Sequence, residues 1–227
     1  MNLYILSRPK FGWDDWNKFL TDEGIPIDGA LTGTDFHAAE ALVEASGRLC
    51  YMSYGKGRKT RKEFIDNLIQ SGHHSVLEHA NWSILISGIS RSCSHELVRH
   101  RHFSFSQLSQ RYCNHERSEP IVPPAIGSDP ALEALWRRAM RAAFDAYRDL
   151  DIAMKDLPTK AHRTAARSVL PNATPTKIVV TGNCRAWREF IQKRNIDGAD
   201  PEIRQLAQMV REALVGESEM LFGDLVP

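Results

Sequence analysis

Residues 99–112 (RHRHFSFSQLSQRY) concentrate side chains that can bind an anion. Two Arg-His pairs open the segment, hydroxyl and amide side chains follow them, and Arg111 lies near its end. The segment contains no carboxylate, whereas a solvated charged face normally interleaves acidic and basic residues. Guanidinium groups bind phosphates and carboxylates through paired hydrogen bonds. The segment therefore predicts a site for a ligand that carries phosphate.

A second basic region spans residues 163–195. Taken alone, it is typical of an amphipathic helix with a solvated basic face, but beside the first region it favours ligand binding. If Arg185 binds a ligand, we expect it to have no local carboxylate partner that neutralises its charge. The arginines of this region are Arg163, Arg167, Arg185, Arg188 and Arg194, with Glu189 as their acidic neighbour.

Histidines gather in GHHSVLEHA (residues 72–80), which contains His73, His74 and His79. A zinc site is the first alternative, but the spacing lacks the HExxH order in which two histidines flank a general base. Ser75 and Glu78 have the spacing of a capping box, which predicts the start of a helical turn. The free N–H groups of such a start can also bind an anion. No metal site is therefore predicted.

The motif RHR-x7-S, from Arg99 to Ser109, resembles the signature of the flavin-dependent thymidylate synthases, and its continuation QLSQRY is also similar to that family. ARSVLP, NCR and KR in the second basic region resemble the family's second half. The resemblance covers roughly residues 39–213. It implies the methylation of dUMP to dTMP, a methyltransferase reaction. The methylene would come from 5,10-methylenetetrahydrofolate, and the reducing equivalents from NADPH through FAD. It also implies a homotetramer whose active sites are shared between subunits.

The resemblance assigns roles residue by residue. Arg194 would be the catalytic residue, which stabilises negative charge on the uracil ring. The FAD contacts would be His73, Ser75, Arg99, His100, Arg101, Gln107, Asn183, Arg185 and Glu189. The dUMP contacts would be Glu96, Leu97, Val98, Arg99, Gln107, Leu108, Ser109, Gln110, Arg111, Arg167 and Arg194.

Two positions depart from the family pattern. Position 189 is Glu, where family members carry His or Asn against the flavin, and position 107 is Gln, where some carry Glu. Gln can both donate and accept hydrogen bonds, so we expect the role of position 107 to survive. None of the four cysteines occupies a nucleophile position in the matched motifs. Cys113 and Cys184 are expected to be small packed thiols rather than nucleophiles.

Composition narrows the class of protein. The chain has 227 residues and a formal net charge of +1, so bulk charge favours neither a nucleic-acid partner nor an acidic surface. No apolar run approaches a membrane span, and the sparse cysteines fit a reducing cytoplasm. A nucleic-acid-binding module and a metal-dependent hydrolase are the rival functions. The first lacks a known motif and the second lacks ligand spacing.

Periodicity predicts one α+β domain spanning residues 1–227, with a mixed or antiparallel sheet flanked by helices rather than a regular βαβ alternation. Residues 11–33 are expected to be loop with a helical turn, and residues 54–62 a basic loop. The apolar stripe on the helix at 130–154 predicts core packing. Strands are expected at 2–7, 80–89 and 177–181, an extended segment or loop at 103–112, and further helices at 35–52, 64–70, 90–101, 160–170, 183–195 and 203–215.

Overall fold

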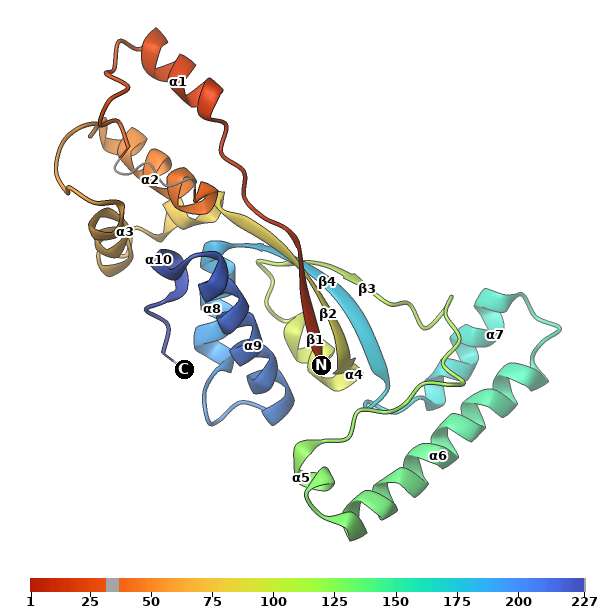
Figure 1. Ribbon diagram of the computed structural model, residues 1–227. Helices are drawn as coiled ribbons and strands as arrows, with labels where there is room; N and C mark the ends of the chain where they lie inside the picture. The colour runs from red at the N-terminus through yellow and green to blue at the C-terminus, as the bar shows by residue number, and fades with distance from the viewer. Residues whose placement is uncertain (32–36, 227) are drawn as a thin grey trace. The chain divides into compact units, whose positions relative to one another are not determined.

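The computed structural model describes residues 1–31 and 37–226 and has the predicted α+β class, with a four-stranded sheet and helices (Figure 1). The strand order is β1-β2-β4-β3. The strands are β1 (Asn2–Ser7), β2 (Asn81–Ser90), β3 (Ser104–Gln107) and β4 (Pro175–Asn183). The helices are α1 (Trp13–Asp22), α2 (Ala38–Tyr51), α3 (Arg61–Gln70), η1 (His74–His79), α4 (Arg91–Leu97), α5 (Pro124–Gly127), α6 (Pro130–Ala153), α7 (Thr159–Ala166), η2 (Arg167–Val169), α8 (Cys184–Arg194), α9 (Pro201–Glu217) and α10 (Glu219–Phe222).

The two long strands β2 and β4 run antiparallel. Near the start of β2, the Ser83 hydroxyl lies 2.8 Å from the hydroxyl of Thr181, near the end of β4. Just past β2, the Arg91 N–H donates to the Thr174 carbonyl, which precedes β4, at 2.9 Å. As the residue number increases along β2, the number of its hydrogen-bonded partner near β4 decreases, which is the pattern of antiparallel strands. Alternate side chains of both strands are buried, as the period-two pattern requires.

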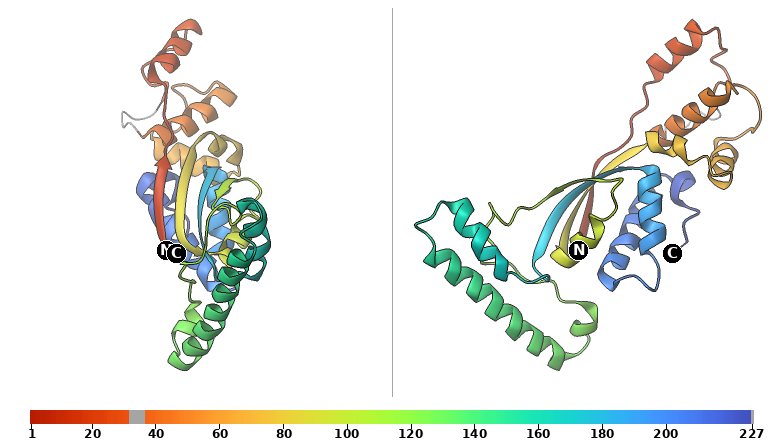
Figure 2. Two further views of the ribbon diagram at one scale, coloured as in Figure 1. Left: turned by 90° about the vertical axis from the view of Figure 1, so that its right-hand side faces the viewer. Right: turned by 180° about the vertical axis from the view of Figure 1, so that it is seen from behind.

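β1 forms one edge of the sheet, beside β2 (Figure 2). Gly88 of β2 has a positive φ of 70°, and the backbone of Met1 lies 3.3 Å from the place that a Cβ would occupy there. Glycine is required at this position both for the backbone conformation and for the close approach of the chain's first residue.

The helix predicted from residue 35 is α2, and Phe36 and Asp35 lie outside the described residues. The expectation of a mere helical turn within 11–33 is wrong, because α1 has 10 residues. An aromatic cluster supports α1: the Phe11 ring centroid lies 4.6 Å from that of Trp13 and 5.9 Å from that of Trp16. These aromatic side chains at the start of the helix pack on one another, a contact that helical periodicity does not reveal.

The helix predicted over 90–101 ends earlier, at Leu97. Single turns continue the chain, with the Arg99 N–H donating to Glu96 and the His100 N–H to Leu97. Phe103 is buried, with 7% of its surface exposed, and it draws the backbone away from the helix axis before β3 begins. The helix predicted over 160–170 likewise changes from α7 to the 3-10 turn η2.

The apolar stripe of α6 packs in the core over only part of its length. Phe144 and Tyr147 are 9% and 0% exposed, whereas Leu132 and Leu135 are 48% and 55% exposed. Core packing is therefore confirmed for the C-terminal part of α6 and wrong for its N-terminal part. No helix in residues 1–31 and 37–226 is long and apolar enough to cross a membrane.

Contacts divide the chain into two compact units, each built from segments distant in sequence. The expectation of a single domain stays a prediction. Unit 1 comprises residues 1–4, 85–180 and 198–206, and unit 2 comprises residues 5–84, 181–197 and 207–227.

Candidate functional site

Unit 1 contains a cavity of about 290 Å³ beside helix α4. Arg91, Ser94 and His95 line it from this helix, one helical turn apart, together with the predicted contact Val98. Gln107 of β3, which lies later in the sequence motif, lines the same cavity. The remaining lining residues are Gln110, Leu170, Pro171 and Asn172. The structure thus brings together Val98, Gln107 and Gln110 of the predicted dUMP contacts.

The backbone N–H groups at the start of α4 are occupied by protein acceptors. Glu202 accepts from the N–H of Ser90 at 2.7 Å and from its hydroxyl at 2.6 Å. The same Ser90 hydroxyl accepts from the Cys93 N–H at 3.0 Å. The N–H groups of Arg91 and Ser92 donate to the carbonyls of Thr174 and Asn172. Recognition of an anion in the cavity must therefore come from side chains rather than from this helix start.

Gln107 is held by two hydroxyls. Its Nε2 donates to Ser94 Oγ at 2.7 Å and to Thr176 Oγ1 at 3.3 Å. The Ser94 hydroxyl proton is already donated to the Arg91 carbonyl at 3.0 Å. A carboxylate at position 107 would face the Ser94 oxygen without a proton between them. The hydroxyl network therefore suits the Gln of this chain and explains its departure from Glu.

The sequence analysis missed Arg91 and five other residues that line the cavity, which are Ser94, His95, Leu170, Pro171 and Asn172. Burial first, and the nearby charge of Arg167 second, lower the pKa of Arg91. Neither guanidinium forms an ion pair within the described part of the chain. Two neighbouring cations without a carboxylate favour an anionic ligand. The helical spacing of Arg91, Ser94 and Val98 is the signal that could have identified it.

The segment after β3 is tied to the sheet and to α7. The Leu108 N–H donates to the Lys177 carbonyl at 2.9 Å, and the Arg111 N–H donates to Ser109 Oγ at 3.3 Å. The Arg111 side chain donates from Nε to Thr164 Oγ1 at 3.3 Å. This hydrogen bond uses the Nε–H of the guanidinium and fixes the direction of its remaining N–H groups.

The arginines of the RHR motif are exposed. Arg99 and Arg101 form no ion pair among residues 1–31 and 37–226, and His100 packs its ring 6.2 Å from that of Phe103. Of their predicted neighbours, the Leu97 side chain is fully buried and Glu96 is half-buried. Leu97 can therefore contribute backbone but no side-chain contact to a ligand.

Unit 2 contains the second predicted set, beginning with η1. The capping box predicted for Ser75 and Glu78 is wrong, because Ser75 lies inside η1 and no side chain caps this helix. The Glu78 carboxylate instead accepts from Arg185 of α8 at 2.7 Å. His73 lies just before η1, and its ring stacks on Tyr51 with centroids 6.3 Å apart.

Helix α8 carries the remaining predicted residues of unit 2. Asn183 is its N-cap, and the Asn183 side chain accepts from the Ala186 N–H at 2.9 Å. Glu189 is paired with Lys193 one turn later, and Arg194 is the last helical residue. Placement of these residues on one helix is confirmed.

The basic face predicted for this helix is not uniformly solvated. Arg188 is 5% exposed, and its two terminal nitrogens donate to the Asp224 carboxylate at 2.6 and 2.5 Å. Although burial alone would raise it, the hydrogen bonds from Arg188 lower the pKa of Asp224. Arg188 therefore attaches the C-terminal segment to α8 and is a structural arginine.

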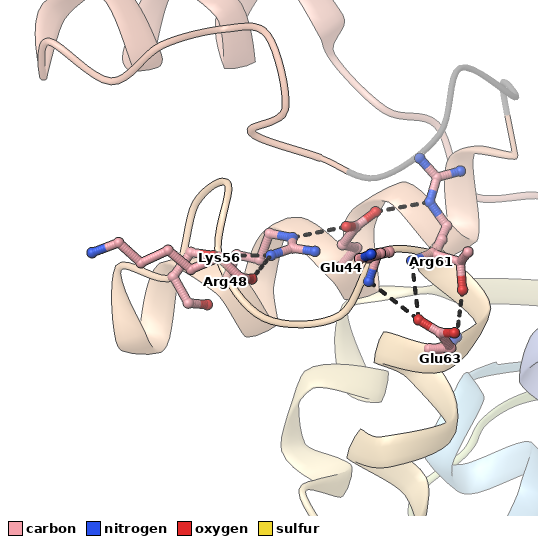
Figure 3. A network of polar contacts seen from close by, with 8 residues as sticks. Glu44, Arg48, Lys56, Arg61 and Glu63 are labelled. Carbon is pink, nitrogen blue, oxygen red and sulfur yellow. Dashed lines mark hydrogen bonds and ion pairs between the residues drawn. The ribbon is translucent and has the colours of Figure 1, made fainter.

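The basic loop that connects α2 to α3 is fixed by a buried network (Figure 3). Glu44 lies between two guanidinium groups, 2.8 Å from Arg48 Nε and 2.9 Å from Arg61 Nε. Arg48 also donates to the carbonyls of Ser53 at 2.9 Å and Lys56 at 3.3 Å. The loop is shorter than expected, because Thr60 and Glu63 form a capping box and Arg61 begins α3. Two of the cations in this region, Arg48 and Arg61, are thus structural.

Residues 33–217 match the family described as "Thymidylate synthase complementing protein". The flavin-dependent thymidylate synthase of Mycobacteroides abscessus is 48% identical over 203 residues, which cover 84% of this chain and 81% of that protein. The chain belongs to the flavin-dependent thymidylate synthase family. The corresponding enzyme of Corynebacterium efficiens is 45% identical with the same coverage.

The fold is also that of this family. A crystal structure of the flavin-dependent thymidylate synthase of Helicobacter pylori, in complex with FAD and dUMP, has a TM-score of 0.64. It is 23% identical and covers 83% of this chain and 96% of that chain.

Cys184 of this thymidylate synthase is a packed thiol rather than a nucleophile. Burial raises the pKa of Cys184 to about 12, so its thiol stays protonated at neutral pH. Cys93 is also buried, Cys113 is half-buried and Cys50 is exposed. No three His, Cys, Asp or Glu side chains among residues 1–31 and 37–226 gather in an arrangement that could hold a metal ion.

Proposed function

We propose that this chain methylates dUMP to dTMP, with 5,10-methylenetetrahydrofolate as carbon donor and NADPH as reductant through bound FAD. The observation that carries the proposal is the cavity beside α4, which Arg91 lines without an ion-pair partner among the described residues, together with the nearby charge of Arg167. A nucleotide monophosphate supplies the anion that these cations lack. Gln107 of the motif from Arg99 to Ser109, and Gln110 just after it, line the same cavity.

The arginines of this chain fit a cofactor with a pyrophosphate. Arg48 and Arg188 are buried and paired with carboxylates, whereas Arg99 and Arg101 are exposed and form no ion pair in the described residues. The latter two are therefore available to FAD. The flavin supplies redox chemistry that no side chain can perform. The full set that we assign to FAD is His73, Ser75, Arg99, His100, Arg101, Gln107, Asn183, Arg185 and Glu189.

The residues of the chain bind and polarise the nucleotide. We assign the dUMP phosphate to Arg111 and Arg167, with Ser109 as a hydroxyl donor rather than a nucleophile, because no oriented base accompanies it. Arg194 would place its planar guanidinium against the uracil N3 and O4 edge and stabilise negative charge on the ring. This would make C5 nucleophilic without a cysteine adduct. The other proposed dUMP contacts are Glu96, Leu97, Val98, Arg99, Gln107, Leu108 and Gln110.

We further propose a cytoplasmic homotetramer with active sites shared between subunits. The exposed leucines of α6, Leu132 and Leu135, support association with another copy, because apolar side chains in a helical row gain stability when covered. Sedimentation of the purified protein tests the assembly, and a monomer at micromolar concentration would contradict it.

The proposed activity is tested on purified, flavin-loaded protein. We expect a flavin absorption spectrum, release of FAD on denaturation, and dTMP formation that requires NADPH, methylenetetrahydrofolate and dUMP together. Arg101→Ala should lower FAD occupancy without unfolding the chain. Protein that binds no flavin, or that forms no dTMP when loaded with FAD, would contradict the proposal.

The substrate assignment has a separate test. Arg111→Ala should weaken dUMP binding by about 1.5–3 kcal/mol, since one charge-assisted hydrogen bond is lost. Calorimetric titration measures this difference on the flavin-loaded protein. An unchanged dissociation constant would remove Arg111 from the site.

A further inference from the structure

Asp151 and His162 form a buried polar pair in unit 1, outside the cavity. His162 Nδ1 lies 2.7 Å from Asp151 Oδ1, and the two residues are 7% and 8% exposed. Asp151 lies near the end of α6, and His162 lies in α7. Because a buried carboxylate is costly without a partner, the pair fixes the position of α7 on α6.

Helix α7 depends on such an anchor. It has 8 residues, follows Pro158 and has no side-chain cap at its start. A helix of this length is marginal by itself, and its stability comes from packing. The contact between Asp151 and His162 therefore fixes how α7 is rotated about its axis and where it lies along α6.

The other side chains of α7 hold the segment that follows β3. Arg163 donates to the Tyr112 carbonyl, and Thr164 Oγ1 accepts from Arg111 Nε at 3.3 Å. The Lys160 ammonium lies 5.4 Å from the centroid of the Tyr112 ring. Three residues within about one turn of α7 thus contact Arg111 and Tyr112.

We propose that Asp151 and His162 are positioning residues for dUMP, which act through α7 on the segment Ser109–Tyr112. The proposal rests on the assignment of dUMP to Ser109, Gln110 and Arg111 under the proposed function. Neither Asp151 nor His162 lines the cavity. A displaced α7 would move Arg111 relative to the cavity and weaken substrate binding, although every ligand contact remains in the sequence.

The decisive experiment compares three variants as flavin-loaded protein. Asp151→Ala breaks the buried pair, and His162→Asn keeps an amide N–H in the place of Nδ1. Asp145→Ala is the matched control, because Asp145 lies on the same helix in an exposed pair with Arg148, 2.9 Å away. We expect Asp151→Ala to weaken dUMP binding about tenfold and to raise KM more than it lowers kcat. His162→Asn and Asp145→Ala should bind dUMP as the wild type does.

Calorimetry with dUMP, FAD content and the thermal midpoint separate positioning from general damage. A normal dUMP affinity for folded Asp151→Ala would overturn the proposal, as would an equal loss in His162→Asn. If Asp151→Ala does not fold, His162→Ala replaces it, because it removes the same hydrogen bond from the other side, and an unchanged dUMP affinity in that variant overturns the proposal. Wild-type protein that binds no dUMP would instead contradict the proposed function itself.

Discussion

Glu78 and Arg185 are 107 residues apart in the sequence, and their side chains form an ion pair at 2.7 Å. The pair connects η1, which follows His73, to the first turn of α8, which follows Asn183. The sequence predicts no local carboxylate partner for Arg185, and the structure provides a distant one instead. The assignment of Arg185 to FAD stays a prediction. The ion pair allows two tests of it, one that removes Arg185 and one that removes the carboxylate of Glu78.

We expect Glu78→Gln to strengthen FAD binding and Arg185→Ala to weaken it, because Glu78 competes with the cofactor for the same guanidinium. The side chains are 45% and 53% exposed. An exposed pair contributes at most about 1 kcal/mol, so the gain in Glu78→Gln should not exceed about fivefold. Fluorescence titration of the flavin-free protein measures both constants, and urea unfolding should show little change in stability. Weaker FAD binding in Glu78→Gln would mean that the intact ion pair is what the cofactor requires.

Replacement of Arg194 should separate a role in dTMP formation from a role at the end of helix α8. A cation there stabilises the helix by about 0.3–1 kcal/mol, and Lys193 at the preceding position is available for the same effect. We expect Arg194→Ala to depress dTMP formation strongly, while reduction of bound flavin by NADPH continues. Arg194→Lys should not restore full activity, since an ammonium lacks the planar fork.

Lys193→Ala is the matched control for Arg194, because it removes the neighbouring charge from the same helix end. It should leave turnover near the wild-type rate. Normal turnover in Arg194→Ala would leave this residue as a helix-end charge, and normal turnover in Arg194→Lys would mean that charge alone is needed.

Single cysteine replacements should leave measurable dTMP formation. Burial raises the pKa of Cys184 to about 12, so Cys184→Ala removes a packed thiol rather than a nucleophile. Its cost should appear in the unfolding midpoint and not in turnover per folded, flavin-loaded molecule. Loss of turnover in any one of the four variants, with FAD and dUMP still bound, would restore a covalent cysteine mechanism.

Stability should decline as the pH falls through the range in which histidine titrates, and His115 should contribute to the decline. Burial first, and the charge of Arg91 second, lower the pKa of His115 below its ordinary value of 6.5. Between that value and the lower folded pKa, the unfolded chain binds a proton that the folded chain does not. Stability is therefore present above about pH 6.5 and is lost as the pH falls toward the folded pKa.

Denaturation at a series of pH values checks this contribution in the wild type and in His115→Gln. The Gln side chain keeps polar atoms near Ser118, whose hydroxyl lies 3.1 Å from His115 Nδ1. We expect the variant to lose less stability between about pH 7 and pH 5 than the wild type. Identical slopes would assign the acid sensitivity to other groups.

Local sequence signals predicted most elements of the fold. The alternating apolar residues of β2 and β4 and the helical period of α2, α6 and α8 each depend on neighbours in the chain, so they can be read from the sequence. The family motif also predicts an anion-binding segment around Arg99. Where an aromatic cluster stabilised α1, or where buried Phe103 ended the helix early, local periodicity was insufficient.

Only the tertiary structure decided which cations are structural and which are available to a ligand. The arginines of α8 look alike in sequence, but Arg188 is buried against Asp224 and Arg185 is exposed beside Glu78. Both partners are distant in the chain, so no spacing rule reveals them. Arg91 became a candidate site residue for the same reason, because Thr174, which precedes β4, and Gln107, which lines the cavity, come from other segments of the chain. The sequence determined the residue types that could bind an anion, and long-range packing decided which charges remain uncompensated.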